Sequence, residues 1–183
     1  ILWGANATND QDYATSYIPS NGSTVTRNQD VCNNGGSLAS INSTEGVLYA
    51  EIAALANGGT GRWISISDGT GTNRVSLSYE ASPTIIRVYI RNSGGVVFDF
   101  QKSGQTQTDF NKIAVKYKVN DFALWVNGVE VASDFLGNTY PENTLNSLQF
   151  NSGGGSSPFF GKTKALAVFP YLSDAELTAL TTI

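Results

Sequence analysis

Residues 110–133 read FNKIAVKYKVNDFALWVNGVEVAS, and this stretch decides the fold. Apolar and polar side chains alternate along residues 113–119 and again along 122–126, with the period of two that is typical of half-buried strands. The Asn127-Gly128 dipeptide tolerates the positive φ angles of a type I′ turn, so a third strand over residues 129–132 should fold straight back. The centre of the chain is therefore predicted to be an antiparallel β-meander.

Similar period-two patterns flank this centre. They predict strands over residues 62–67, 74–79, 84–91, 96–101, 145–150 and 163–169. Residues from Thr44 are predicted as a strand as well, although residues 51–56 could equally form a short helical turn. Most of the connections between residues 74 and 101 are only a few residues long, and such short connections require antiparallel neighbours.

The tail carries a helix signal. Ser173 and Glu176 have the spacing of a capping box, so a short terminal helix should follow and bury Leu177 and Leu180. About ten short strands with turns between them and almost no helix predict an all-β fold, a two-sheet antiparallel β-sandwich of the jelly-roll kind with a short C-terminal helix.

The composition limits the classes of function. A chain of 183 residues suits one domain with a real core. Its net charge of −4 and its lack of a basic cluster argue against nucleic acid as a partner. No apolar run approaches the roughly 18 residues of a membrane span, so membrane insertion is not expected. The absence of histidine removes Ser-His-Asp and Cys-His catalysis, and the single cysteine, Cys32, cannot form an internal disulfide.

The chain is divided into two parts. Residues 1–30 hold aromatic side chains in a polar, Pro- and Gly-punctuated background, which indicates an extended N-terminal segment that packs on the domain or leads into it. Residues 31–183 are predicted to form the sandwich. The chain starts at Ile1 and contains no methionine, so we expect it to be part of a longer protein.

Several blocks carry a family resemblance. The hairpin FNKIAVKYKVNDFALWVNGVEV and the closing GKTKALAVFPYLSDAEL resemble the laminin-G-like branch of the concanavalin A-like lectin/glucanase superfamily. Phe110 stands where a Trp is usual in that branch, so an aromatic side chain is kept. The resemblance covers nearly the whole chain and implies a concanavalin A-like jelly roll. It does not fix a ligand, because the superfamily includes lectins, glycosidases, lyases and structural modules.

The N-terminal region points to a context. Residues 3–5, 13–19 and 24–27 (WGA, YATSYIP and TVTR) are similar to the junction ahead of such domains in tail and other virion proteins of tailed bacteriophages. The resemblance implies a virion protein that acts extracellularly. Its partners would be a host-surface polysaccharide or glycan and other virion proteins, with oligomerisation through the parent protein.

Catalysis is not expected. Glucanase relatives carry Glu-x-Asp-x-x-Glu on one strand, which places two carboxylates about 5 Å apart, and none of the 15 acidic residues has that spacing. The nearest approach, Asp174-x-Glu176, is explained by helix capping. Polysaccharide lyases of this superfamily use a His or Tyr base with Arg and Gln nearby. Their strand signatures are missing here, and the residues that could form such a site are Arg87, Tyr89, Arg91 and Gln101.

Binding is the better hypothesis, and the period of two places the candidate surface. If the apolar residues of 74–101 point inward, the other face carries Arg74, Glu80, Arg87, Tyr89, Arg91, Asp99 and Gln101. Planar donors and carboxylates suit sugar hydroxyls, and an aromatic ring suits the C–H side of a sugar. The alternative is the solvated side of a sheet, where opposite charges pair across strands for less than about 1 kcal/mol each.

Two further candidates remain. Trp63 and Trp125 fall on the polar side of their strands, so each is either an aromatic platform for a sugar or a buried structural residue. The loop from Asp68 to Asn73 has oxygens that could bind Ca²⁺, as some laminin-G-like domains do, although ordinary turn chemistry also explains it. No cofactor is required. The sequence therefore predicts a non-catalytic lectin-like domain, with a structural virion module without a ligand as the alternative and a lyase or glycosidase as the third choice.

Overall fold

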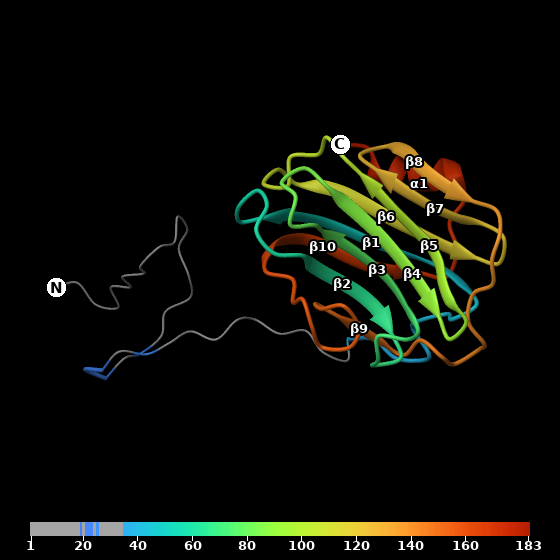
Figure 1. The fold of residues 1–183 in the computed structure, drawn as a ribbon, viewed down its shortest axis with the longest axis horizontal. Coiled ribbons are helices and arrows are strands. Elements are labelled where there is room, and N and C mark those ends of the chain that lie inside the picture. Colours follow the sequence, from blue (N-terminus) through green and yellow to red (C-terminus); the bar gives the residue numbers. More distant parts are fainter. Residues whose placement is uncertain (1–18, 20, 24, 26–34) are drawn as a thin grey trace. The chain divides into compact units, whose positions relative to one another are not determined.

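The computed structural model describes residues 19, 21–23, 25 and 35–183 (Figure 1). The predicted N-terminal segment, residues 1–30, lies almost entirely outside the described residues, and Cys32 lies outside them too. Residues 35–183 contain ten strands and one helix: β1(Glu45–Ala54), β2(Arg62–Ser67), β3(Arg74–Tyr79), β4(Ile86–Asn92), β5(Gly95–Lys102), β6(Asn111–Lys118), β7(Phe122–Val126), β8(Val129–Asp134), β9(Ser147–Gln149), β10(Gly161–Phe169) and α1(Asp174–Thr181). No helix in these residues is long and apolar enough to cross a membrane.

The predicted meander forms the middle of the first sheet, whose strand order is β10-β1-β6-β7-β8 with antiparallel pairing. Asn127 and Gly128 join β7 to β8 with φ angles of 51° and 84°, as the type I′ turn requires. Strand β1 extends to Ala54, so the helical alternative for residues 51–54 does not occur.

The second sheet has the order β5-β4-β3-β2-β9, again with antiparallel pairing. Strands β2 to β5 form an unbroken meander because their connections are short. Inward-facing side chains of both sheets meet in one core, whose members include Leu48, Ile64, Leu77, Val88, Ile113 and Leu124. The two layers are visible in Figure 1, with the second sheet in front. The prediction of a two-sheet sandwich is confirmed.

Helix α1 packs on the outer face of the first sheet, against β6, β7 and β8. Leu177 is fully buried there, and Leu180 is partly buried against the same cluster, which also contains Trp125. Lys116 on β6 ties the helix to the sheet with ion pairs of 2.8 Å to Asp174 and 2.7 Å to Asp121. Burial lowers the pKa of Lys116, but the hydrogen bonds to the two carboxylates outweigh it and raise the pKa. Part of one outer face of the sandwich is thus covered by the protein's own helix.

Replacing Ser173 by alanine should loosen this cover. The Ser173 hydroxyl accepts a hydrogen bond from the Glu176 amide, and the Ser173 amide donates to the Glu176 carboxylate at 2.8 Å. Loss of a capping side chain costs about 1 kcal/mol. We expect the urea midpoint to fall accordingly with an unchanged m-value. Ser93→Ala, in an exposed turn, is the control, and equal midpoints for the two variants would contradict the capping role.

Candidate functional site

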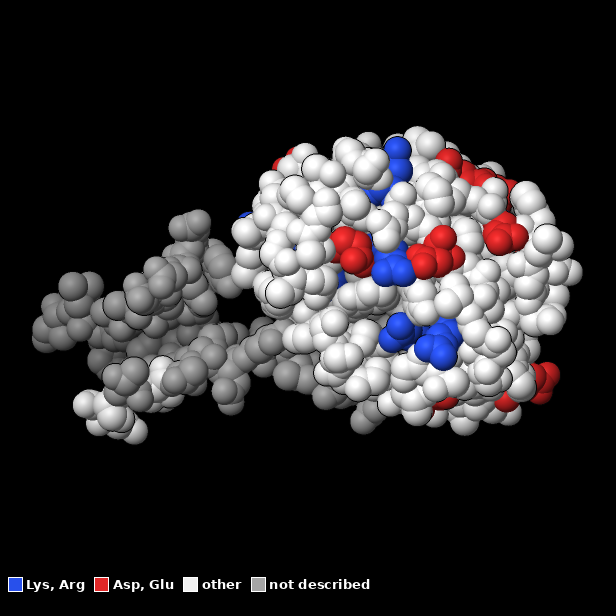
Figure 2. All heavy atoms as spheres, in the orientation of Figure 1, with Lys and Arg blue, Asp and Glu red and all other residues white. Residues whose placement is uncertain are grey.

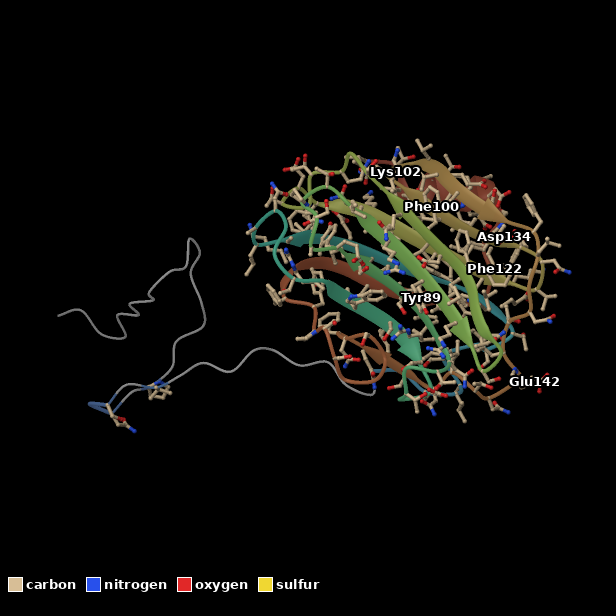
Figure 3. All side chains as sticks on the ribbon, viewed as in Figure 1. Tyr89, Phe100, Lys102, Phe122, Asp134 and Glu142 are labelled. Atoms are coloured by element: carbon tan, nitrogen blue, oxygen red, sulfur yellow. The ribbon has the colours of Figure 1, made fainter. Side chains whose placement is uncertain are left out.

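Within residues 35–183, no helix covers the outer face of the second sheet. Strands β2 to β5 point their second set of side chains to this face, and Tyr89 lies near its middle (Figure 3). The outward residues on these strands are Trp63, Ser65, Ser67, Arg74, Ser76, Ser78, Arg87, Tyr89, Arg91, Asp99 and Gln101. Basic side chains gather over β3 and β4, with acidic side chains beside some of them (Figure 2).

Four side chains from three strands form one stack, which we call the aromatic–arginine cluster: Trp63, Arg74, Arg87 and Tyr89. The rings of Trp63 and Tyr89 meet edge to face with centroids 6.1 Å apart. The Arg74 guanidinium carbon lies 4.9 Å from the Tyr89 centroid and 5.5 Å from that of Trp63, and the Arg87 carbon lies at 5.0 and 5.8 Å. Each cation is within the range of a cation–π interaction with both rings.

Arg87 has a carboxylate partner on the neighbouring strand. Its Nε and Nη2 atoms donate to the two oxygens of Asp99 at 2.7 and 2.6 Å. This bidentate hydrogen bonding raises the pKa of Arg87. The pair holds the Arg87 guanidinium in a fixed plane beside Tyr89, and it leaves Asp99 with both oxygens engaged.

Arg74 is held differently. Its Nη1 atom donates to the backbone carbonyl of Ser152 at 2.5 Å, and its own backbone carbonyl accepts a hydrogen bond of 2.6 Å from the Tyr140 hydroxyl. Burial lowers the pKa of Arg74, and the neighbouring charges of Arg91 and Arg87 lower it further, against the effect of Tyr89. Arg74 is therefore a half-buried cation whose surroundings include two other cations.

Beneath the cluster lies a floor of serines, Ser65, Ser67, Ser76 and Ser78, all fully buried although they point outward. The loop after β9 packs on one side of this floor, where the Ser65 hydroxyl donates to the Asn151 carbonyl at 2.8 Å. Ser78 donates to Glu80 at 2.7 Å. These serines were not among the residues predicted from the sequence to form the site. The signal was present, because serine recurs with a period of two in both RWISIS and RVSLSY.

The other predicted site residues divide into two groups. Arg91 and Gln101 are exposed on the same face as the cluster. Trp125 does not belong to this face, because it lies on the outer side of the other sheet, 6% exposed, in the cluster that α1 covers. The interpretation of Trp125 as a sugar platform is thus wrong, and the structural alternative accounts for its position.

The predicted calcium loop is closed by its own side chains. One oxygen of Asp68 accepts hydrogen bonds from the amide and hydroxyl of Thr70 at 2.8 and 2.6 Å, and the other accepts from the Asn73 side-chain amide at 2.7 Å. Burial raises the pKa of Asp68, but these hydrogen bonds outweigh it and lower the pKa. The Asn73 nitrogen, and not its oxygen, faces Asp68, so turn chemistry explains the loop without an ion. Among the described residues, no group of three or more His, Cys, Asp or Glu side chains could hold a metal.

A pocket of about 440 Å³ lies elsewhere, between residues 38–44 and residues 142 and 143. It is lined mainly by small and polar residues, and Glu142 is its one charged lining residue. It has no aromatic lining. The aromatic–arginine cluster, and not this pocket, therefore carries the chemistry suited to recognition.

No family model matches the chain, and no curated protein matches it. Many solved structures share its fold. The CBM40 of Ruminococcus gnavus IT-sialidase, bound to α2,3 sialyllactose, matches with a TM-score of 0.63 and 18% identity over 76% of this chain and 83% of that chain. Domain 4 of AbnA, a GH43 extracellular arabinanase from Geobacillus stearothermophilus, in complex with arabinotriose, matches with a TM-score of 0.60 and 12% identity over 80% of this chain and 70% of that one.

Domains LG4-5 of the mouse laminin α1 chain match with a TM-score of 0.58 and 10% identity, over 76% of this chain and 38% of the laminin chain. At these identities the likeness concerns the fold. It is consistent with the concanavalin A-like jelly roll that the hairpin and the closing helix predicted.

Proposed function

We propose that this domain is a non-catalytic, lectin-like module that binds glycan on the outer face of the β5-β4-β3-β2-β9 sheet. The observation that carries the proposal is the aromatic–arginine cluster. It offers two aromatic rings for the C–H faces of sugars, with guanidinium donors and the exposed Gln101 side chain around them for hydroxyl groups. On the opposite outer face α1 packs against β6, β7 and β8, whereas no helix in residues 35–183 packs on this sheet.

The fold neighbours support the same class of ligand. The CBM40 and the arabinanase domain were solved with bound oligosaccharides, so this sandwich is a scaffold on which sugar binding occurs. A fold hosts many functions, and the inference for this chain therefore rests on its own cluster.

The proposal extends to a biological context. The resemblance of residues 3–5, 13–19 and 24–27 to phage junctions supports a place in a tail or other virion protein, where the domain would meet host-surface glycan outside the cell. Weak affinity at one site suits that place, because repeated copies on one particle raise the effective concentration.

A glycan array with the chain displayed multivalently on beads tests the binding function. Tyr89→Ala should weaken selective binding roughly thirtyfold, since truncation of an aromatic anchor costs about 2 kcal/mol. Tyr171→Ala, which removes an exposed tyrosine outside the cluster, is the matched control and should bind as the parent does. Equal binding by Tyr89→Ala and the parent would contradict the proposal that glycan binds at the aromatic–arginine cluster.

An assembly module is the second candidate. Val119, Phe135 and Leu136 are 46%, 67% and 78% exposed. They lie close together, because the Asn120 amide donates to the Gly137 carbonyl at 3.0 Å. Apolar side chains gathered in this way are suited to another protein surface. If no glycan on the array binds while the chain stays folded, the assembly function is favoured. The next experiment is then a search for a neighbouring virion protein that binds this apolar patch.

A further inference from the structure

The candidate face carries more positive than negative charge. Arg74 and Arg91 are direct cross-strand partners in the β3–β4 register. Like charges directly opposite each other destabilise a sheet. Arg87 is paired with Asp99, but within residues 35–183 neither Arg74 nor Arg91 forms an ion pair with a carboxylate. Three of the 11 basic residues of an acidic chain are thus concentrated on two adjacent strands, with one carboxylate bound to them.

Unpartnered polar atoms gather at the same place. Among the described residues, four buried side-chain atoms have no hydrogen-bond partner, and three of them are Arg74 Nε, Ser76 Oγ and Gln149 Oε1. Ser76 is two residues from Arg74 on β3 and is opposite Ser65, which is opposite Gln149. Ser76 and Gln149 are 0% and 7% exposed. Buried polar atoms are normally satisfied, so Arg74 Nε and Ser76 Oγ, two residues apart on β3, indicate a place for a missing polar group.

The chemistry of Arg74 Nε and Ser76 Oγ favours an anion, whereas the side-chain oxygen of Gln149, two strands from Ser76, only accepts hydrogen bonds. A guanidinium only donates hydrogen bonds, and a serine hydroxyl can donate. A carboxylate or sulfate oxygen accepts from both, and a planar guanidinium binds such oxygens in bidentate fashion. An anion there would also offset the opposed charges of Arg74 and Arg91. A neutral hydroxyl would satisfy a donor but would leave the charge uncompensated.

We propose that Arg74, Arg91 and Ser76 form a subsite for an anionic substituent, a carboxylate or a sulfate, of the glycan. This inference rests on the proposed function of the face. Arg74 Nε is buried beneath the cluster, so binding requires the Arg74 side chain to turn outward. Its Nη1 atom then exchanges the Ser152 carbonyl for an oxygen of the anion, and that carbonyl is left to accept from water. Trp63 and Tyr89 remain as the platform for the sugar ring beside it.

The test compares four surfaces: a uronic acid polysaccharide, its carboxyl-reduced form, a sulfated polysaccharide and its desulfated form. The parent chain should bind one acidic polymer at least tenfold more tightly than its neutral counterpart, since hydrogen bonds to charged groups contribute that much. Arg91→Gln should lose most of this preference, so that its binding to the acidic and the neutral polymer becomes nearly equal. Lys162→Gln, an exposed lysine on β10, is the charge-matched control and should behave as the parent does. The acidic polymer with the larger preference over its neutral counterpart identifies carboxylate or sulfate as the ligand group.

A second measurement does not depend on polysaccharide binding. The Nε–H signal of Arg74 is followed by ¹⁵N NMR while sodium glucuronate or sodium sulfate replaces chloride at constant ionic strength. The signal should shift in the parent and shift less in Arg91→Gln. If the polymers bind without preference for the acidic form and the Arg74 signal does not move, the subsite is overturned while the lectin function stands. If no polymer binds but the signal responds, the anion subsite stands and the glycan function fails. If neither occurs, both are overturned.

Discussion

Replacing Gln107 by alanine is expected to lower the free energy of unfolding by about 3 kcal/mol. Gln107 is fully buried at the end of the sandwich. Its side-chain NH₂ donates to the carbonyls of Glu80, Ser82 and Ile85 at 3.1, 2.9 and 3.0 Å, and its side-chain oxygen accepts from the Gly58 amide at 3.0 Å. Truncation leaves the Gly58 N–H and the Glu80 carbonyl without these partners, at about 1 to 3 kcal/mol for each group.

The effect matters for the candidate face. The turn over residues 80–85 joins β3 to β4, which carry Arg74 and Tyr89, and Gly58 lies on the connection that leads into β2 and Trp63. Urea denaturation measures the loss. Gln101→Ala, the same substitution at an exposed position on β5, should change the free energy of unfolding by less than about 0.5 kcal/mol. A loss below about 1 kcal/mol for Gln107→Ala would show that water replaces the amide and that the side chain does not hold the two turns.

The strands were predictable because their signals are local. Residues 62–67 and 74–79 were predicted with the same bounds as β2 and β3, and Asn127-Gly128 gave the β7–β8 turn. A period of two separates the faces of a strand wherever one face is buried. For the same reason, the outward position of Arg87, Tyr89 and Asp99 followed from the alternation along β4 and β5. The capping box likewise gave the start of α1.

The part that could not be predicted depends on contacts between distant residues. Trp63 and Trp125 have the same local pattern, and only the docking of α1 on one sheet decides that Trp125 is covered. The loop after β9 lies about 86 residues from the serines that it contacts, so nothing near Ser65 in the sequence indicates the Asn151 carbonyl. The concentration of charge at Arg74 and Arg91 requires the cross-strand register, which alternation alone does not fix. The sequence thus predicts which side chains share a face, and the pairing of strands decides which of them meet.

Raising the pH from 10 to 12 is expected to remove much of the stability of the domain. The hydroxyl groups of Tyr79, Tyr117 and Tyr140 are buried and donate to the backbone carbonyls of Ile52, Asn42 and Arg74 at 2.8, 2.6 and 2.6 Å. Burial raises the pKa of Tyr79 from 10.0 to about 12, against smaller opposite effects of Asn111 and Arg62. Burial also raises the pKa values of Tyr117 and Tyr140.

The sign follows from the raised pKa values. Below pH 10 each hydroxyl is protonated in both states, so its contribution to stability is fully present. As the pH rises toward the folded-state pKa, the unfolded chain releases its proton first and is favoured, so that contribution is lost. For Tyr79 the loss is about 2 kcal/mol by pH 12, and the raised pKa values of the other two tyrosines add losses in the same direction. Because a typical domain is stabilised by only about 5 to 15 kcal/mol, losses at three buried hydroxyl groups remove a large part of that stability.

Urea denaturation at a series of alkaline pH values measures this loss, and tyrosinate absorbance of the folded chain locates the titration. Tyr140→Phe should be less stable at neutral pH, because it loses the hydrogen bond to the Arg74 carbonyl. Above pH 10 its free energy of unfolding should fall less steeply with pH, because about one proton fewer is released on unfolding. Tyr171→Phe, which removes an exposed hydroxyl, should follow the parent curve. If Tyr140→Phe falls as steeply as the parent, a different group controls the alkaline transition. Lys116, whose raised pKa reflects its ion pairs with Asp121 and Asp174, would then be the group to test, because loss of its charge releases α1 from the first sheet.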